Sequence, residues 1–297
     1  MPATKPKHTL LPGYTNAPPL LSFLYENWAD IATQLLCLTT AILLYTLCPP
    51  LMSHWLPSTP DPTFGLKYGQ PVRKEYINTI VMAVISFGVP AVVMGSVGLW
   101  CMRDFWDGNA AIKGLGLALS TSTLTINILK ITIGGLRPHF LSICDPQPPH
   151  PWRPPMWSTV ADLCASNDTG ALKEAQMSWP SGHACSAFAG FGFLALWLNA
   201  KVKAVGFGRR RRARSCSGGE EWEWDDEEKL AGLGTVVVVV FLPVVVAGVL
   251  AGSKVRDGWH HPVDVVCGGL IGVVFAHVGF LAYYLSVYDT RYNHIPR

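Results

Sequence analysis

The chain has 297 residues, of which 49% are hydrophobic and only 14% carry a charge. A soluble globular domain carries about a quarter charged residues, so this composition excludes a disordered chain, a nucleic-acid-coating basic protein and an ordinary cytosolic enzyme. It indicates a protein that crosses a membrane several times and has no nucleic acid among its partners.

Six stretches are long and apolar enough to cross a bilayer, which takes about 20 mostly apolar residues in a helix. In chain order they are residues 31–51, 77–100, 111–133, 182–200, 230–252 and 263–286. The fifth contains a run of valines that would suggest a strand in water. A lone strand cannot satisfy its backbone in lipid, so we expect a helix that tolerates Pro243. The predicted fold class is all-α, a six-transmembrane helix bundle.

Six spans place both ends of the chain on the same side of the membrane. We expect a polar cytosolic tail at 1–29, a six-span domain at 30–288 and a second cytosolic tail at 289–297. Within the domain, 134–180 forms a lumenal loop and 201–229 a charged cytosolic loop with 8 of the 23 Lys and Arg residues. This orientation follows from the positive-inside rule, because it puts 14 basic residues on the cytosolic side and 9 on the other.

Two features of the loop at 134–180 agree with a lumenal position. Asn167 begins an Asn-Asp-Thr tripeptide, which is the acceptor sequence for N-glycosylation. Cys144 and Cys164 lie in the same loop and could pair there. No pair of cysteines has metal-ligand spacing, so no zinc or iron–sulfur site is expected.

Three polar segments lie beside helix ends on this lumenal face. The first contains Lys130 and Arg137, which project from one face if the helix continues as far as Pro138. Two cations held side by side repel each other unless an anion lies between them. Taken alone, the pair is also explained by two long side chains that snorkel, so that their charged ends lie at the membrane–water interface.

The second segment opens the fourth span with Ser181, Gly182 and His183. Ser181 is a good N-cap, and the free backbone N–H groups at a helix start bind anions. Gly182 lets a ligand approach the backbone, and His183 in the first turn is within reach of that ligand. A capped helix with an interfacial histidine is the alternative reading.

The third segment runs from Ser253 to Asp264, between the fifth and sixth spans. If a helix starts near His260, Asp264 lies one turn later, where its carboxylate could accept the Nδ1 proton and leave Nε2 of His260 free for chemistry. Pro262 fits a first-turn position and supports this helix start. A satisfied His–Asp pair is the alternative. Together, the three segments favour an oxyanion site, because a transporter would place such groups nearer the midplane.

At these residues the chain resembles the type-2 phosphatidic acid phosphatases, also called lipid phosphate phosphatases, a family with three motifs on a six-helix membrane fold. The segment 130–138 matches the motif KxxxxxxRP, and 180–183 matches PSGH. The third motif, SRxxxxxHxxxD, is matched at Ser253, His260 and Asp264. The resemblance extends roughly from residue 106 to 286. The chain is similar to the eukaryotic branch of this family, which includes fungal diacylglycerol pyrophosphate phosphatases.

The resemblance implies a phosphohistidine mechanism at the lumenal or extracellular membrane boundary. His260 would attack phosphorus, Asp264 would orient it, and His183 would protonate the departing oxygen and then activate water. The phosphate would be bound by Lys130, Arg137, Ser181, Gly182 and Lys254.

The implied substrates are phosphatidic acid, lysophosphatidic acid and diacylglycerol pyrophosphate in a vacuolar, Golgi, endoplasmic reticulum or plasma membrane. Cations would neutralise the phosphate, so no metal, magnesium or other cofactor is expected. No protein partner is implied.

One departure from the family pattern keeps other functions open. Lys254 stands where the family has arginine, and lysine lacks the planar fork of a guanidinium. Losing one directed hydrogen bond to an anion costs about 10²–10³ in rate. A catalytically weak or inactive relative that binds phospholipid headgroups is therefore an alternative. A vanadium-dependent haloperoxidase would share the anion pocket, but those enzymes are soluble and six apolar spans oppose that reading.

Overall fold

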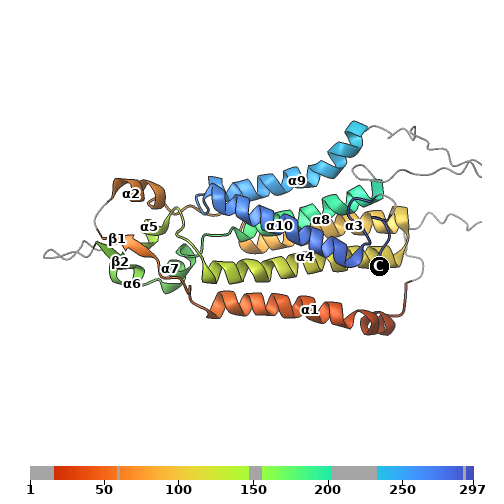
Figure 1. Ribbon diagram of the computed structural model, residues 1–297, viewed down its shortest axis with the longest axis horizontal. Helices are drawn as coiled ribbons and strands as arrows, with labels where there is room; N and C mark the ends of the chain where they lie inside the picture. The colour runs from red at the N-terminus through yellow and green to blue at the C-terminus, as the bar shows by residue number, and fades with distance from the viewer. Residues whose placement is uncertain (1–16, 59–60, 147–155, 203–232, 290–291) are drawn as a thin grey trace, which may run out of the picture.

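The structure is a computed structural model that describes residues 17–58, 61–146, 156–202, 233–289 and 292–297. Long helices run side by side along the molecule (Figure 1). They are α1 (Leu20–Leu47), α3 (Thr79–Val97), α4 (Phe105–Thr132), α8 (Gly182–Val202), α9 (Leu233–Arg256) and α10 (Pro262–Tyr283). A short π-helical segment, η1 (Gly98–Met102), extends α3.

Within the described ranges, five helices are long and apolar enough to cross a membrane, so the chain is an integral membrane protein. They are α1, α3 together with η1, α4, α8 and α10. Each overlaps one of the predicted stretches. The remaining predicted stretch, 230–252, falls on α9, which is helical and contains Pro243 as expected.

The centre of the bundle is α8, which contacts α3, α4, α9 and α10. Two glycines of α10 allow a close approach to α8. A Cβ atom on Gly268 would lie 2.3 Å from the carbonyl oxygen of Ser181, and one on Gly272 would lie 2.4 Å from that of Cys185. Small residues at such positions let membrane helices pack tightly. This packing holds the starts of α8 and α10 together.

The first helix begins earlier than predicted. α1 starts at Leu20, so the last ten residues of the expected tail at 1–29 are helical. The reason is pairing with α4: the Asn109 amide donates to Asn27 at 3.2 Å, and Lys113 forms an ion pair with Asp30 at 2.9 Å. Hydropathy alone assigns Asn27 to a polar tail, because its partner Asn109 lies far away in the sequence.

Small elements cover one end of the bundle, at the left of Figure 1. We call residues 48–78 and 134–180 the cap. Its elements are α2 (Pro62–Tyr68), α5 (Phe140–Cys144), α6 (Val160–Leu163), α7 (Thr169–Ala175) and the antiparallel strands β1 (Trp55–Pro57) and β2 (Trp157–Thr159). The two strands depart from the all-α prediction. They come from separate loops and are three residues each, which is too short for a recognisable alternation.

Two predictions for the loops have different outcomes. The cap contains a Cys144–Cys164 disulfide, which confirms the pairing considered from the sequence. The charged loop predicted at 201–229 lies almost entirely outside the described residues. Its first residue, Lys201, belongs to α8 and forms a buried ion pair with Asp107 of α4 at 2.6 Å.

Candidate active site

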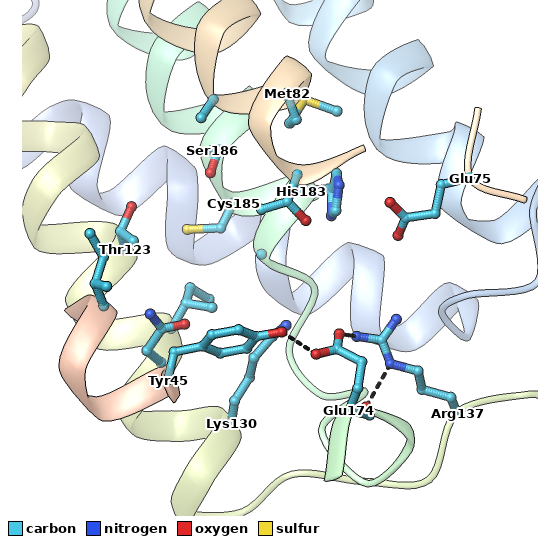
Figure 2. Close-up of a pocket in the computed structure, with 16 residues that line it drawn as sticks. Tyr45, Glu75, Met82, Thr123, Lys130, Arg137, Glu174, His183, Cys185 and Ser186 are labelled. Carbon is cyan, nitrogen blue, oxygen red and sulfur yellow. Dashed lines mark hydrogen bonds and ion pairs between the residues drawn. The ribbon is translucent and has the colours of Figure 1, made fainter. Parts of the chain in front are cut away.

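A cavity of about 260 Å³ lies where the bundle meets the cap, and Figure 2 shows its lining. Four of the predicted site residues line it: Lys130, Arg137, Gly182 and His183. The lining residues that were not predicted from the sequence include Tyr45, Glu75 and Glu174. Two of the three predicted segments therefore meet around one cavity, together with α1 and the loop before α3. No residue of the third segment, 253–264, lines the cavity.

The two cations of the first segment reach this cavity by a route that differs from the prediction. α4 ends at Thr132, and the chain then turns through Gly134 and Gly135 with φ of 57° and 151°, so the helix does not continue to Pro138. Left-handed backbone of this kind favours glycine. Arg137 returns to the site because its backbone N–H donates to Ala175 at the end of α7, at 2.9 Å. Both Lys130 and Arg137 are buried.

Arg137 is held by the carboxylate that sequence reasoning missed. Its Nε donates to the Glu174 carbonyl at 2.9 Å, its Nη2 is ion-paired with the Glu174 carboxylate, and the guanidinium stacks over Trp259 at 4.9 Å. The Tyr45 hydroxyl donates to the same carboxylate (Figure 2). Burial raises the pKa of Glu174, but Arg137 and Lys130 outweigh burial and hold that pKa below its usual range. Glu174 is therefore ionised.

Lys254 occupies a position behind the cavity wall. It is fully buried, its Nζ lies 3.3 Å from the Glu75 carboxylate, and it donates to the Ile77 carbonyl. Glu75 lines the cavity, whereas Lys254 is not among the lining residues. The structure therefore does not place Lys254 where it would contact a phosphate in the cavity, as the sequence predicted. Glu75 stands between the lysine and the cavity.

The start of α8 is built as predicted. The Ser181 hydroxyl accepts from the Ala184 N–H at 3.5 Å, which confirms an N-cap. The Ser181 N–H donates to the Asp264 carbonyl at 3.0 Å, so the starts of α8 and α10 are joined. A Cβ atom on Gly182 would stand 3.9 Å from the Lys130 ammonium, in the space between that cation and the helix start.

His183 presents an unsatisfied nitrogen at this helix start. Its side chain is 9% exposed, and its Nε2 is buried without a hydrogen bond to any described residue. A buried polar atom without a partner is costly in a native protein and is a common feature of ligand sites. The hydrogen bond from Ser181 to Asp264 joins the starts of α8 and α10, so His183 and His260 lie at the same end of the bundle.

His260 and Asp264 lie together, but not with the direct hydrogen bond predicted. Their Nδ1 and Oδ2 atoms are 3.7 Å apart, which is an ion-pair contact too long for a hydrogen bond. The helix begins at Pro262 with the His261 N–H donating to the Asp264 carboxylate at 3.0 Å. The Ser178 hydroxyl donates to the same oxygen at 2.6 Å and lies 3.5 Å from Nδ1 of His260. Ser178 therefore bridges the pair, and sequence reasoning missed it.

Burial determines the charge state of His260, which is 2% exposed. Burial lowers the pKa of its imidazole to about 3. The cations Arg137 and Lys130 act in the same direction, and Asp264 opposes them. The imidazole is therefore neutral at physiological pH and keeps a lone pair for attack.

Fold and site together define a class: a helical membrane protein with a cavity that is lined by two cations and by a helix start with its histidine. A second histidine lies beside Asp264 at the neighbouring helix start. Within the described part of the chain, no three His, Cys, Asp or Glu side chains are grouped so that they could hold a metal ion.

The family follows from comparison with known proteins. The family model described as PAP2 superfamily matches residues 111–288, so the chain belongs to that family. No solved structure matches.

Curated relatives agree with the family. The chain is 29% identical over 219 residues to the probable lipid phosphate phosphatase 4 of Arabidopsis thaliana, covering 74% of this chain and 62% of that protein. It is 29% identical over 206 residues to diacylglycerol pyrophosphate phosphatase 1 of Saccharomyces cerevisiae, covering 68% of this chain and 63% of that protein. The chain thus spans about three fifths of the length of these relatives.

Proposed function

We propose that the protein is an integral-membrane lipid phosphate phosphatase that hydrolyses phosphatidic acid, lysophosphatidic acid or diacylglycerol pyrophosphate. The observation that carries this proposal is the meeting of Lys130, Arg137 and the α8 start with His183 at one cavity. His260 and Asp264 lie beside this helix start, where the Asp264 carbonyl accepts from the Ser181 N–H. The names of the relatives support the substrate class. Phosphate release from phosphatidic acid in detergent tests the proposal.

In the proposed reaction, Nε2 of His260 attacks phosphorus and the bond from phosphorus to the lipid oxygen breaks. His183 gives a proton to the departing oxygen, which releases the lipid alcohol and leaves a phosphohistidine. His183 then takes a proton from water, whose oxygen attacks phosphorus, and inorganic phosphate leaves with His260 restored. Asp264, steadied by Ser178, stabilises the positive charge on His260 during both steps.

Cationic side chains take the part that metal ions play in other phosphatases. Lys130, Arg137, the Gly182 N–H and the Ser181 hydroxyl would bind the non-bridging oxygens. Glu174 binds Nε and one terminal nitrogen of Arg137, and the rest of the guanidinium is available to the phosphate. We therefore expect phosphate release to continue in excess EDTA. A loss of activity in EDTA that magnesium restores would contradict this part of the proposal.

We propose the predicted topology as well: six spans with α9 as the fifth, and tails and the charged loop at 201–229 in the cytosol. The cap and the site then face the lumen or the cell exterior. The Cys144–Cys164 disulfide supports this, because disulfides persist in oxidising compartments. Asn167 is exposed on the cap, as an acceptor for a glycan requires. A glycosidase-sensitive mobility shift that disappears in Asn167→Gln tests the orientation.

Replacing Ser178 with alanine is expected to lower kcat by about 10–100-fold with little change in KM. The hydroxyl donates to a carboxylate that orients the nucleophile, and a hydrogen bond to a charged group is worth about 1.5–3 kcal/mol. Ser178→Thr keeps the donor and serves as the matched control. An equal loss in both variants, or a loss confined to KM, would contradict the bridging role of Ser178.

The alternative, a weak or inactive relative that binds phospholipid headgroups, is favoured by the position of Lys254. This lysine is bound to Glu75 and the Ile77 carbonyl rather than exposed to the cavity. Tight vanadate binding without turnover of any lipid phosphate would support the alternative.

A double-mutant cycle tests what Lys254 does. We expect Lys254→Met to lower kcat/KM by about 10²-fold, because it leaves the Glu75 carboxylate unpaired beside the phosphate. Adding Glu75→Gln removes that repulsion and should recover a large part of the loss. Additive losses in the double variant would instead mean that Lys254 binds the phosphate directly.

A further inference from the structure

An aromatic side chain joins Arg137 to the turn that precedes His260. Trp259 is the residue before His260, and the Arg137 guanidinium lies over its ring, 4.9 Å from the ring centroid. The His139 imidazole contacts the same indole in a T-shaped arrangement, with ring centroids 4.9 Å apart. The indole N–H donates to the Arg73 carbonyl, in the loop before α3, at 2.8 Å. Trp259 therefore contacts the segment that carries Arg137 and is attached to the backbone of a third segment.

The turn that carries Trp259 is fixed by hydrogen bonds. Gly258 has a φ of 73°, a left-handed conformation that favours glycine. The N–H groups of Trp259 and His260 both donate to the Lys254 carbonyl, at 3.1 and 3.3 Å. Nδ1 of the buried His139 donates to the Gly258 carbonyl at 3.0 Å, because a carbonyl can only accept. The indole is therefore mounted on a well-fixed stretch of backbone, immediately before His260.

Arg137 is held by two different kinds of contact. Glu174 accepts from Nε and Nη2 along one edge of the guanidinium, and Trp259 packs against the group. Hydrogen bonds along one edge still allow the guanidinium plane to tilt, and the contact with the indole opposes that tilt. The Arg137 side chain is only 3% exposed, and the attraction between a cation and an indole is strongest where water is excluded.

The position of Arg137 relative to His260 matters for the proposed reaction. Arg137 lines the cavity, whereas no residue of the segment 253–264 does, so His260 has to reach a phosphate whose place is set by other parts of the chain. A displacement of about 1 Å between reacting groups costs about 10²-fold in rate. Trp259 provides a direct connection between the cation in the cavity and the imidazole beside it.

We infer that Trp259 is a positioning residue, which keeps the Arg137 guanidinium in register with His260. This inference rests on the proposed function and adds to it a residue that acts on the phosphate through Arg137. Lys130 and the α8 start would still bind the phosphate without Trp259. Its loss should therefore affect the chemical step more than substrate binding.

A matched pair of variants separates the face of the indole from its N–H. Trp259→Phe keeps an aromatic face for Arg137 and loses the donor to Arg73, whereas Trp259→Gln keeps a donor and loses the face. We expect kcat for phosphatidic acid to fall about 10²-fold in Trp259→Gln and less than about fivefold in Trp259→Phe, with KM changed less than about threefold in both. Trp157→Gln, on a β2 residue that is 53% exposed, is the control and should match the wild type. Equal losses in the two variants, or a larger loss in Trp259→Phe, would overturn the inference.

Two inhibitors give a readout that a purely structural role would not move. Vanadate adopts the five-coordinate geometry of phosphorus in the transition state, whereas inorganic phosphate stays tetrahedral. In Trp259→Gln we expect the inhibition constant of vanadate to rise by about the factor by which kcat falls, and that of phosphate to change less than about threefold. An equal weakening of both inhibitors would mean that Trp259 only supports the shape of the cavity, and would overturn the inference.

A double-mutant cycle tests whether Trp259 acts through Arg137. Lysine lacks the planar guanidinium, so Trp259→Gln should cost less than about fivefold in an Arg137→Lys background. A full loss of about 10²-fold on top of Arg137→Lys would show that Trp259 acts by another route. If Arg137→Lys is too slow for rates, the same cycle is measured as vanadate affinity.

The outcomes separate this inference from the proposed function. If Trp259→Gln hydrolyses phosphatidic acid as well as the wild type does, the positioning role is wrong and the phosphatase stands. If the wild type hydrolyses no phosphate ester, the proposed function is wrong and vanadate binding decides the inference. Weaker binding in Trp259→Gln alone then supports the positioning role, and equal binding in all three proteins overturns it. If Trp259→Gln is not recovered folded, Trp259→Met, with a flexible side chain and no ring, takes its place.

Discussion

Replacing His260 with alanine is expected to reduce phosphate release from phosphatidic acid by about 10⁴-fold or more. Removing a nucleophile that forms a covalent intermediate leaves only binding and electrostatic stabilisation, which cannot replace the missing bond. The imidazole is buried and supported on its Nδ1 side by Ser178 and Asp264, and His260 itself is not among the residues that line the cavity. The measurement is the steady-state release of phosphate by purified protein in detergent.

A second histidine provides the control for this variant. His277 lies in α10 away from the cavity, and its ring bonds the Val273 carbonyl and the Tyr288 hydroxyl. We expect His277→Ala to release phosphate at close to the wild-type rate. If His260→Ala kept a substantial rate, or if no acid-labile phosphoprotein formed from labelled substrate in the wild type, His260 would not be the nucleophile.

The pH dependence of the first chemical step follows from the pKa of His260. A pKa lowered to about 3 keeps the imidazole neutral at pH 5, whereas an imidazole with the ordinary pKa of about 6.5 is only about 3% neutral at that pH. With p-nitrophenyl phosphate, whose leaving group needs no proton from His183, single-turnover phosphoprotein formation should change little between pH 7 and pH 5, after correction for ionisation of the substrate phosphate by ³¹P NMR. A decline of about 25-fold over this range would show that the His260 pKa is not lowered.

The sequence predicted the parts of the site that rest on local chemistry. Ser181, Gly182 and His183 are placed by a helix start, and a helix start has a recognisable pattern of residues. Arg137 was predicted for the wrong reason. A continuous helix was expected to align it with Lys130, but the chain turns at Gly134 and the backbone pairing with α7 returns Arg137 to the cavity.

The residues that sequence reasoning missed come from segments without a pattern. Glu75 lies in a loop and Glu174 in a short helix of the cap, and each matters only because a cation lies opposite it in the folded protein. Tyr45 lies in α1 and is connected to the site by the hydrogen bond from its hydroxyl to the Glu174 carboxylate. Ser178 could have been suspected, since it lies two positions before the Pro180 that opens the second motif. A single sequence gives no sign that its hydroxyl reaches a carboxylate 86 positions away.

Replacing His183 with alanine is expected to separate the two halves of the reaction. The imidazole lines the cavity, and its Nε2 is buried without a partner among the described residues, where a departing oxygen or an attacking water would meet it. A general acid–base group contributes about 10²–10⁴-fold. We therefore expect phosphatidic acid hydrolysis to fall by about 10³-fold, because the lipid alkoxide needs a proton to leave.

A substrate whose leaving group needs no proton should behave differently in the same variant. With p-nitrophenyl phosphate, His260 can still be phosphorylated, but the phosphohistidine then lacks the base that activates water. Rapid mixing should show a burst of nitrophenolate close to one equivalent per protein, followed by slow release, together with accumulation of phosphoprotein. Neither burst nor phosphoprotein should appear in the His183→Ala His260→Ala double variant. A single slow phase without a burst in His183→Ala would mean that His183 does not act in the second step, and that the water is activated by another group near the cavity.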